Sequence, residues 1–176
     1  MEDQHAMVAE TIPFFGVYDG HGGTQCAEFL RDNLHTFILS RPDVMTSPEQ
    51  AIRAGIATAE RAFLTKCANE KIESGSTCAI AMIVDDTLVT GNVGDTEIVL
   101  CRAGSPLLLS TKHSLHCNEA GCVGLENFKN LLRQVLFART DYKRCFPSFY
   151  FLIEQYVNGS KDVFFFLVKN LEAISF

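Results

Sequence analysis

Long apolar segments and runs of basic residues are both missing from this sequence of 176 residues. No stretch approaches the roughly 18 uninterrupted apolar residues of a membrane span. The N-terminus MEDQHAMVAE lacks the basic start and the apolar core of a secretion signal. No long run of Lys or Arg stands out, and the formal net charge is −6. We therefore expect neither a membrane protein nor a protein whose main partner is nucleic acid.

Cysteine is plentiful, but it does not follow the pattern of a disulfide-stabilised secreted domain. The seven cysteines are odd in number and irregular in spacing, and most lie in apolar runs, where Cys packs as a small hydrophobic side chain. This favours a reducing location, cytoplasmic or nuclear. The length and the 47% hydrophobic content suffice for one globular domain with a core, and they leave the oligomeric state open.

The hydrophobic pattern predicts two helices in the first part of the chain. A short apolar strand at residues 14–18 leads into a Gly-rich turn at 19–23, and a helix follows this turn. A second helix is expected at 47–69, where the segment beginning at Ser47 offers a capping box and a Pro in the first turn. The expected apolar faces are Cys26, Leu30, Leu34 and Phe37 in the first helix and Ile52, Ile56, Ala59 and Phe63 in the second.

A series of strands follows the second helix. We expect strands at residues 77–84, 87–93, 97–102 and 107–109, separated by tips at Asp85-Asp86, at Gly94-Asp95 and at residues 103–106. Short turns between β-prone segments are typical of an antiparallel meander. Two helices followed by several strands indicate an α+β layered domain.

The sequence changes character after His113. A helix is expected at residues 128–136, but the rest of this part is rich in Phe, Lys and Asn without regular spacing, and it holds nine of the 14 Phe residues. We therefore divide the chain into an N-terminal part, residues 1–113, and a tail of unassigned fold, residues 114–176. The tail either covers part of an exposed sheet face or is the product of altered splicing, a frame change or a faulty gene model. The abrupt change of pattern favours the second hypothesis, which the coding DNA across His113 would test.

The turn Asp19-Gly20-His21 has the residue types that metal-assisted phosphoryl transfer requires. A carboxylate at the end of a strand can bridge two hard cations, since each oxygen has several lone pairs. Two metal ions about 3.5–4 Å apart can generate a hydroxide at neutral pH and clamp a phosphoryl group. A nearby His can protonate the departing alkoxide. Asp and Gly are also common in purely structural turns, so the turn alone leaves that reading open.

The string around this turn, FFGVYDGHGG, resembles the signature of the metal-dependent serine/threonine protein phosphatases (the PPM family, type 2C). Further blocks resemble the same family in the same order: MED-x-H at the start of the chain, SGST at 74–77, GNVGDT at 91–96 and LSTKH at 109–113. The resemblance covers residues 1–113. It implies an α+β fold, a partial version of the family's layered β-sandwich flanked by helices.

The resemblance implies roles for the residues of the turn. Asp19 resembles the carboxylate that bridges two metal ions, and Gly20 resembles the residue whose carbonyl oxygen ligates one of them. His21 resembles the proposed general acid. The implied cofactor is a pair of Mg²⁺ or Mn²⁺ ions, and the implied substrates are proteins phosphorylated on Ser or Thr. The implied reaction is attack of a metal-activated hydroxide on phosphorus, without a covalent phosphoenzyme.

Three more carboxylates are assigned to the metal site by the same resemblance. Glu2 and Asp3 resemble residues that hold metal-bound waters, and Asp95 resembles a residue that helps to hold a third metal ion in some members. Each also has a plain alternative. Glu2 and Asp3 lie at a chain end that can fray, and an Asp at a hairpin tip is most often only a turn residue.

The sequence also departs from the family pattern. The phosphate-binding Arg that precedes the MED block in the family has no counterpart here, and neither the DG-x-W/F-D block nor the D-N block occurs after His113. Hard cations need several oxygen ligands, so we expect weak metal binding. Two hypotheses remain: a truncated but active phosphatase, and a non-catalytic phosphatase-like fragment that binds a partner or has no function.

A zinc-binding module is a third hypothesis. His113, His116, Cys117 and Cys122 are residue types that suit zinc. Their spacing, H-x2-H-C-x4-C, fits no common zinc template, and adjacent His and Cys rarely reach one tetrahedral ion together. A zinc assay on a variant with His116→Ala and Cys122→Ala would decide this.

Overall fold

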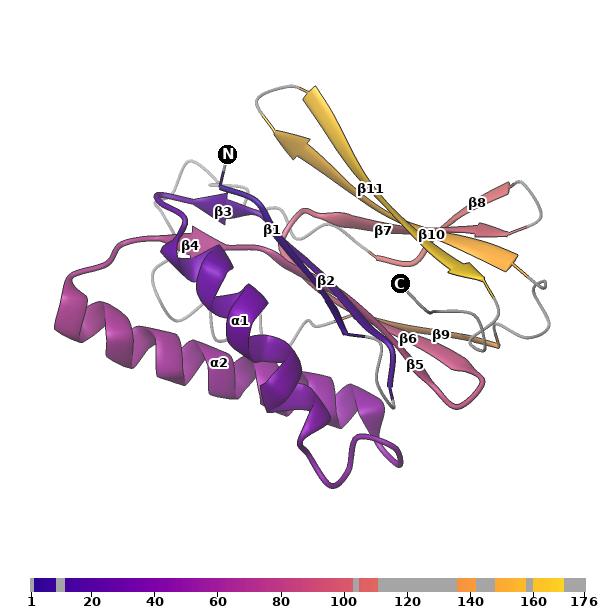
Figure 1. Cartoon of the computed structure of the whole chain (residues 1–176), viewed down its shortest axis with the longest axis horizontal. Coiled ribbons are helices and arrows are strands. Elements are labelled where there is room, and N and C mark those ends of the chain that lie inside the picture. Colours follow the sequence, from indigo (N-terminus) through magenta and orange to yellow (C-terminus); the bar gives the residue numbers. More distant parts are fainter. Residues whose placement is uncertain are drawn as a thin grey trace, which may run out of the picture.

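A computed structural model shows the fold of the chain as layers of helices and antiparallel sheets (Figure 1). It describes residues 2–8, 12–102, 105–110, 136–141, 148–157 and 160–169. The helices among these residues are α1 (Gln25–Leu39) and α2 (Pro48–Glu70). The strands are β1 (Gln4–Val8), β2 (Phe14–Tyr18), β3 (Gly20–His21), β4 (Gly75–Ser76), β5 (Cys78–Val84), β6 (Thr87–Val93), β7 (Glu97–Arg102), β8 (Ser105–Leu108), β9 (Leu136–Asp141), β10 (Ser148–Val157) and β11 (Ser160–Lys169).

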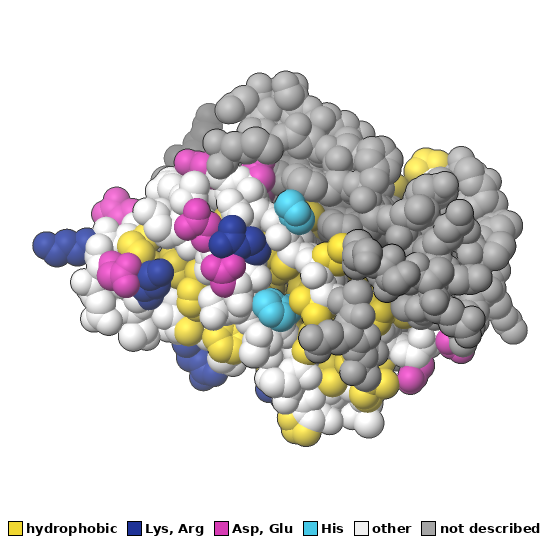
Figure 2. Space-filling model, viewed as in Figure 1, with side chains coloured by type: hydrophobic (Ala, Val, Ile, Leu, Met, Phe, Trp, Pro, Cys, Tyr) yellow, Lys and Arg dark blue, Asp and Glu magenta, His cyan; other side chains and the backbone are white. Residues whose placement is uncertain are grey.

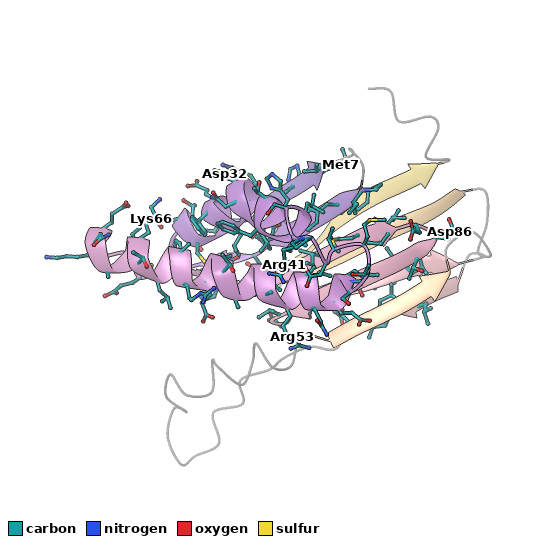
Figure 3. All side chains as sticks on the ribbon, turned by 90° about the horizontal axis from the view of Figure 1, so that it is seen from below. Met7, Asp32, Arg41, Arg53, Lys66 and Asp86 are labelled. Carbon is teal, nitrogen blue, oxygen red and sulfur yellow. The ribbon has the colours of Figure 1, made fainter. Side chains whose placement is uncertain are left out.

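The described strands form a five-stranded sheet, a four-stranded sheet and a short two-stranded sheet. The five-stranded sheet has the order β1-β2-β5-β6-β9, and the four-stranded sheet has the order β11-β10-β7-β8. The two short strands β3 and β4 pair only with each other. Helices α1 and α2 run side by side along one face of the larger sheet (Figures 1 and 3). The expected α+β class is therefore confirmed.

The central strands are buried on both faces, and their alternation separates two cores. In β2, Phe14 and Tyr18 belong to the core beneath the helices, whereas Phe15 and Val17 belong to the core that also contains Ile98 of the smaller sheet. Strand β5 alternates in the same way. Successive side chains of a strand point to opposite faces, so the larger sheet lies between the helix layer and the smaller sheet.

Both expected helices are confirmed, with a local difference in each. The buried residues of α1 are Ala27, Leu34 and Ile38, so only Leu34 of the four expected apolar positions is among them. Helix α2 follows the prediction within one residue at each end, and the four apolar residues expected on its face are buried. The side chain of Ser47, however, makes no capping hydrogen bond. Only its backbone carbonyl engages the helix, accepting from the Ala51 N–H at 3.0 Å. The sequence pattern identified the start of the helix but assigned the wrong atom to the cap.

The expected meander is wrong at its second turn. Strands β6 and β7 are not a hairpin, because β6 pairs with β5 and β9 in the larger sheet while β7 pairs with β8 and β10 in the smaller one. The Gly94-Asp95 segment is instead a crossing between sheets. Gly94 has φ +103°, a conformation that residues with a Cβ rarely adopt. The third turn is also shorter than expected, since β8 already begins at Ser105.

Described strands of the tail extend both sheets. Strand β9 pairs with β6, β10 pairs with β7, and β11 pairs with β10, all antiparallel. Strands of the tail therefore occupy the edges of β6 and β7 that would otherwise be unpaired. The helix expected at 128–136 lies outside the described residues except for Leu136, which begins β9. The four candidate zinc ligands also lie outside them.

The surface of the helix face is mixed in charge. Figure 2 shows acidic and basic side chains interspersed over the described part of this face. Neither of the two described helices is long and apolar enough to cross a membrane.

Figure 3 places Lys66 of α2 and Asp86 of the β5–β6 tip at opposite ends of the described part of the molecule.

Helix α2 ends at a lysine in an unfavourable conformation. Lys71 has φ 55° and ψ 45°, the left-handed conformation that glycine adopts most easily. We expect Lys71→Gly to raise the free energy of unfolding by about 0.5–1 kcal/mol, measured by urea denaturation. Lys66→Gly, inside the same helix, is the matched control and should lower it by about 1 kcal/mol. A destabilising Lys71→Gly would contradict the prediction.

Candidate functional site

The end of β2 places Asp19 at the surface of a rigid element. The strand is buried along its whole length up to Tyr18, after which Asp19 is partly exposed and His21 is exposed. The chain then turns through β3, where Gly20 pairs with Ser76 and His21 with Gly75. Figure 1 shows β3, β4, the start of α1 and the N-terminal end of the chain close together at one end of the molecule.

Ser74, which precedes β4 and β5, contacts the start of α1 just after the turn that carries Asp19. The hydroxyl of Ser74 accepts a hydrogen bond from the Cys26 N–H at 3.1 Å, which satisfies one of the free N–H groups at the start of α1. Thr24, the residue that precedes α1, makes no side-chain capping bond. A residue that is distant in the sequence therefore caps this helix. Gly22 and Gly23 allow the turn with φ angles of 68° and 126°.

Glu2 and Asp3 lie next to the turn because Gly20 has no side chain. A Cβ at Gly20 would be 2.6 Å from the carbonyl oxygen of Glu2 and 3.3 Å from the Cβ of Ala27. The backbone of the N-terminal segment thus passes directly over Gly20. This close approach is the reason that two carboxylates from the start of the chain can act on Asp19.

The carboxyl group of Asp19 lies in a strongly acidic environment. Its pKa is raised to about 6, first by burial and then by the negative charges of Asp3, Asp95 and Glu2, with a hydrogen bond between the Asp19 and Asp3 carboxyl groups adding to the effect. The structure thus brings together the four carboxylates that the sequence singled out. Each charged neighbour that raises this pKa is itself a carboxylate.

The donor set suits a hard cation, although it is not a preformed coordination shell. Carboxylate and carbonyl oxygens are the ligands that Mg²⁺ and Mn²⁺ prefer, and a cation would relieve the repulsion that raises the pKa of Asp19. Within the described ranges, however, no group of three or more His, Cys, Asp or Glu side chains is arranged so that it could hold a metal ion. The carboxylates are close enough to repel one another without converging on one point.

The imidazole of His21 lies over Gly75. A Cβ at Gly75 would be 2.9 Å from Cε1 of His21, so the glycine leaves the space that the ring occupies. His21 is not among the groups that shift the pKa of Asp19. The structure therefore places His21 beside the carboxylate cluster, on the exposed side of the turn, and leaves its role as general acid a prediction.

Two threonines connect the parts of the site, and sequence reasoning assigned them no role. The Asp19 N–H donates to Oγ1 of Thr77 at 3.1 Å, and the Thr77 N–H donates to the carbonyl oxygen of Asp19 at 2.8 Å. Oγ1 of Thr77 also lies 2.7 Å from Oγ1 of Thr96, the residue after Asp95. The SGST and GNVGDT blocks were the available signal, but neither indicates that their threonines meet.

Tyr18, immediately before Asp19, has a buried hydroxyl that makes no hydrogen bond within the described part of the chain. Burial raises the pKa of this phenol well above its ordinary value. We expect Tyr18→Phe to raise the free energy of unfolding by about 1 kcal/mol, because it removes a buried polar group that has no partner. Thermal or urea denaturation measures the effect, and a loss of stability would show that the hydroxyl is satisfied in solution.

The sequence resembles known phosphatases over its first 119 residues. The family model described as protein phosphatase 2C matches residues 1–119. Among curated proteins, probable protein phosphatase 2C 59 of Oryza sativa subsp. japonica is 36% identical over 104 residues, which cover 59% of this chain. These residues cover 32% of the length of that relative, so the matched part is about one third of it.

Solved structures share the fold at low sequence identity. A C. elegans sex determining protein superposes with a TM-score of 0.69 at 15% identity, covering 87% of this chain and 47% of that one. The catalytic domain of the serine threonine protein phosphatase PstP, solved in complex with two manganese ions, superposes with a TM-score of 0.59 at 16% identity and covers 88% of this chain and 70% of that one. The family model spans more than half of the sequence, and the carboxylate-bearing turn lies within it. The chain belongs to the protein phosphatase 2C family.

Proposed function

We propose that this chain carries part of the catalytic centre of a metal-dependent protein serine/threonine phosphatase, with phosphorylated proteins as substrates. The acidic environment of Asp19 is the observation that carries the proposal. Burial and three neighbouring carboxylates raise the pKa of this group to about 6, an arrangement that a divalent cation would stabilise. The family match over residues 1–119 supports the same reaction class.

Each residue of the turn has a distinct part in this proposal. Asp19 and the carbonyl oxygen of Gly20 would hold Mg²⁺ or Mn²⁺, and Glu2, Asp3 and Asp95 would hold the surrounding waters or a further ion. When bound, the ions supply the Lewis acidity that activates water and neutralises phosphoryl oxygens. His21, which is exposed at the edge of the turn, would donate a proton to the leaving alkoxide of Ser or Thr.

A non-catalytic phosphatase-like role is the second candidate. It is favoured by the absence of a preformed group of three or more metal-binding side chains within the described ranges. The blocks that supply the later carboxylates in the family also have no counterpart after His113 in this sequence. Such a chain would keep the fold and bind a partner without turnover.

One assay separates the two candidates. The purified chain is titrated with Mn²⁺ while hydrolysis of a phosphothreonine peptide is followed, beside Asp19→Asn and beside Asp43→Asn, a carboxylate that pairs with Arg41 at 2.9 Å away from the turn. Saturable activity that is lost in Asp19→Asn and kept in Asp43→Asn supports the phosphatase. Activity no greater than that of Asp19→Asn in a folded sample supports the non-catalytic role.

The proposed location is a reducing one, cytoplasmic or nuclear. It is supported by Cys26, Cys67 and Cys78, which are free thiols. Cys78 is buried and Cys26 is partly buried, and burial raises the pKa of both thiols to about 12. These groups therefore pack as neutral side chains and are poor nucleophiles.

A further inference from the structure

The hydrogen bonds around Thr77 depart from those of a regular antiparallel ladder. The β2–β5 register ends with Val17 opposite Ala79, and its extension by two residues would place Asp19 opposite Thr77. In a regular hydrogen-bonded pair, each residue donates its N–H to the carbonyl oxygen of the other. Here the Thr77 N–H donates to the Asp19 carbonyl oxygen, but the Asp19 N–H donates to the Thr77 hydroxyl instead.

The carbonyl oxygen of Thr77 has another partner. It accepts the hydroxyl of Ser76 at 2.8 Å. The Thr77 side chain therefore takes over a bond that the main chain usually makes. One of the two hydrogen bonds that hold the Asp19 main chain to Thr77 consequently depends on the rotamer of the Thr77 side chain.

The turn that carries Asp95 fixes that rotamer. Oγ1 of Thr77 lies 2.7 Å from Oγ1 of Thr96, and both threonines are buried, with 8% and 2% of their surfaces exposed. On the methyl side of Thr77, a Cβ at Gly94 would be 2.7 Å from Cγ2. The Gly94–Thr96 turn thus contacts Thr77 through both a hydroxyl and the close packing of a glycine.

A hydroxyl has one donor and two acceptor positions, so Thr77 can accept from Asp19 and bond Thr96 at the same time. Linked hydrogen bonds in a buried environment strengthen each other. The result is a continuous connection from the Asp19 main chain to the residue next to Asp95. The carboxylates of Asp19 and Asp95 are two members of the acidic cluster, and the charge of Asp95 acts on Asp19.

We propose that Thr77 and Thr96 are positioning residues of the metal site, whose hydroxyl pair holds the main chain of Asp19 at a fixed distance from the turn that carries Asp95. The inference deepens the proposed function and rests on its assignment of Asp19 as a metal ligand. The pair does not contact substrate or metal. It sets the spacing between a carboxylate at the end of β2 and one in the crossing from β6 to β7.

The test uses variants that change the hydroxyl with little change in volume. Thr77→Val and Thr96→Val remove it, and Thr77→Ser keeps it. Thr90→Val is the matched control, because Thr90 is also fully buried, lies in β6, and has a hydroxyl without a hydrogen bond among the described residues. Each variant is assayed by amide hydrogen exchange at Asp19 in the metal-free chain and by Mn²⁺ binding followed by electron paramagnetic resonance.

We expect Asp19 exchange to accelerate by about tenfold in Thr77→Val and by several-fold in Thr96→Val, with Thr77→Ser and Thr90→Val close to wild type. Mn²⁺ affinity should fall in the same order, by about tenfold in Thr77→Val. Unchanged exchange at Asp19 in Thr77→Val overturns the inference, and so does an equal loss of affinity in Thr90→Val. If the wild-type chain binds no Mn²⁺, the proposed function fails, and the exchange results still decide whether the pair positions Asp19.

Discussion

Replacing Asp19 with Asn is expected to raise the melting temperature of the metal-free protein at pH 8. Asp19 has a folded-state pKa of about 6, raised by burial and by Asp3, Asp95 and Glu2. The ordinary value in an unfolded chain is about 3.9. At pH 8 the folded protein therefore bears an ionised carboxylate in an unfavourable environment, and the neutral amide of Asn removes this repulsion.

The pH dependence of the effect follows from the sign of the shift. Between about pH 4 and pH 6 the folded state binds the Asp19 proton more tightly than the unfolded state does, so this group makes the wild type less stable as the pH rises through that window. Below about pH 4, Asp19 is protonated in both states. The difference in melting temperature between Asp19→Asn and wild type should thus be largest above pH 7 and should disappear near pH 4.

Differential scanning fluorimetry across this range, in the presence of a chelator, measures the effect. Asp43→Asn is the control, since hydrogen bonding to Arg41 lowers the pKa of Asp43, and its replacement should not stabilise the protein at pH 8. Added Mn²⁺ should raise the melting temperature of the wild type and of Asp43→Asn but not of Asp19→Asn. A less stable Asp19→Asn in the chelator series would show that the carboxylate is favourably paired in the metal-free protein.

Local patterns in the sequence were sufficient to predict β2, both helices and the turn that carries Asp19. The apolar run at residues 14–18 became β2 without change, because a strand buried on both faces needs apolar residues at every position. The 3.6-residue spacing of Ile52, Ile56 and Phe63 identified the buried face of α2. These features depend on residues that are neighbours in the chain.

Features that depend on distant residues were harder to predict. Asp85-Asp86 and Gly94-Asp95 look alike as turn sequences, yet the first closes a hairpin and the second carries the chain to another sheet. Whether the two strands that flank a turn pair with each other depends on what each strand packs against, and the turn residues carry no information on that. Likewise, no local pattern indicates that Thr77 and Thr96 share a hydrogen bond across 19 positions. The proximity of Asp95 to Asp19 was expected only from the family resemblance.

Gly20→Ala is expected to have the largest effect on stability and metal binding together. The added Cβ would lie 2.6 Å from the carbonyl oxygen of Glu2 and 3.2 Å from the Cβ of that residue. A main-chain oxygen cannot rotate aside as the end of a flexible side chain can, and the main chain of Glu2 leads into β1 two residues later. We therefore expect a loss of about 1–3 kcal/mol in the free energy of unfolding, measured by urea denaturation.

The same displacement should separate the carboxylates. Glu2 and Asp3 act on Asp19 only while their segment lies against Gly20, so moving it outward weakens the acidic cluster and should lower the affinity for Mn²⁺. Gly75→Ala is the matched control. Its Cβ would meet the ring of His21, an exposed side chain that can rotate away, so stability and Mn²⁺ binding should stay close to wild type. Equal effects of the two substitutions would show that the N-terminal segment does not lie over Gly20 in solution, because a tightly packed backbone and a mobile ring cannot respond alike.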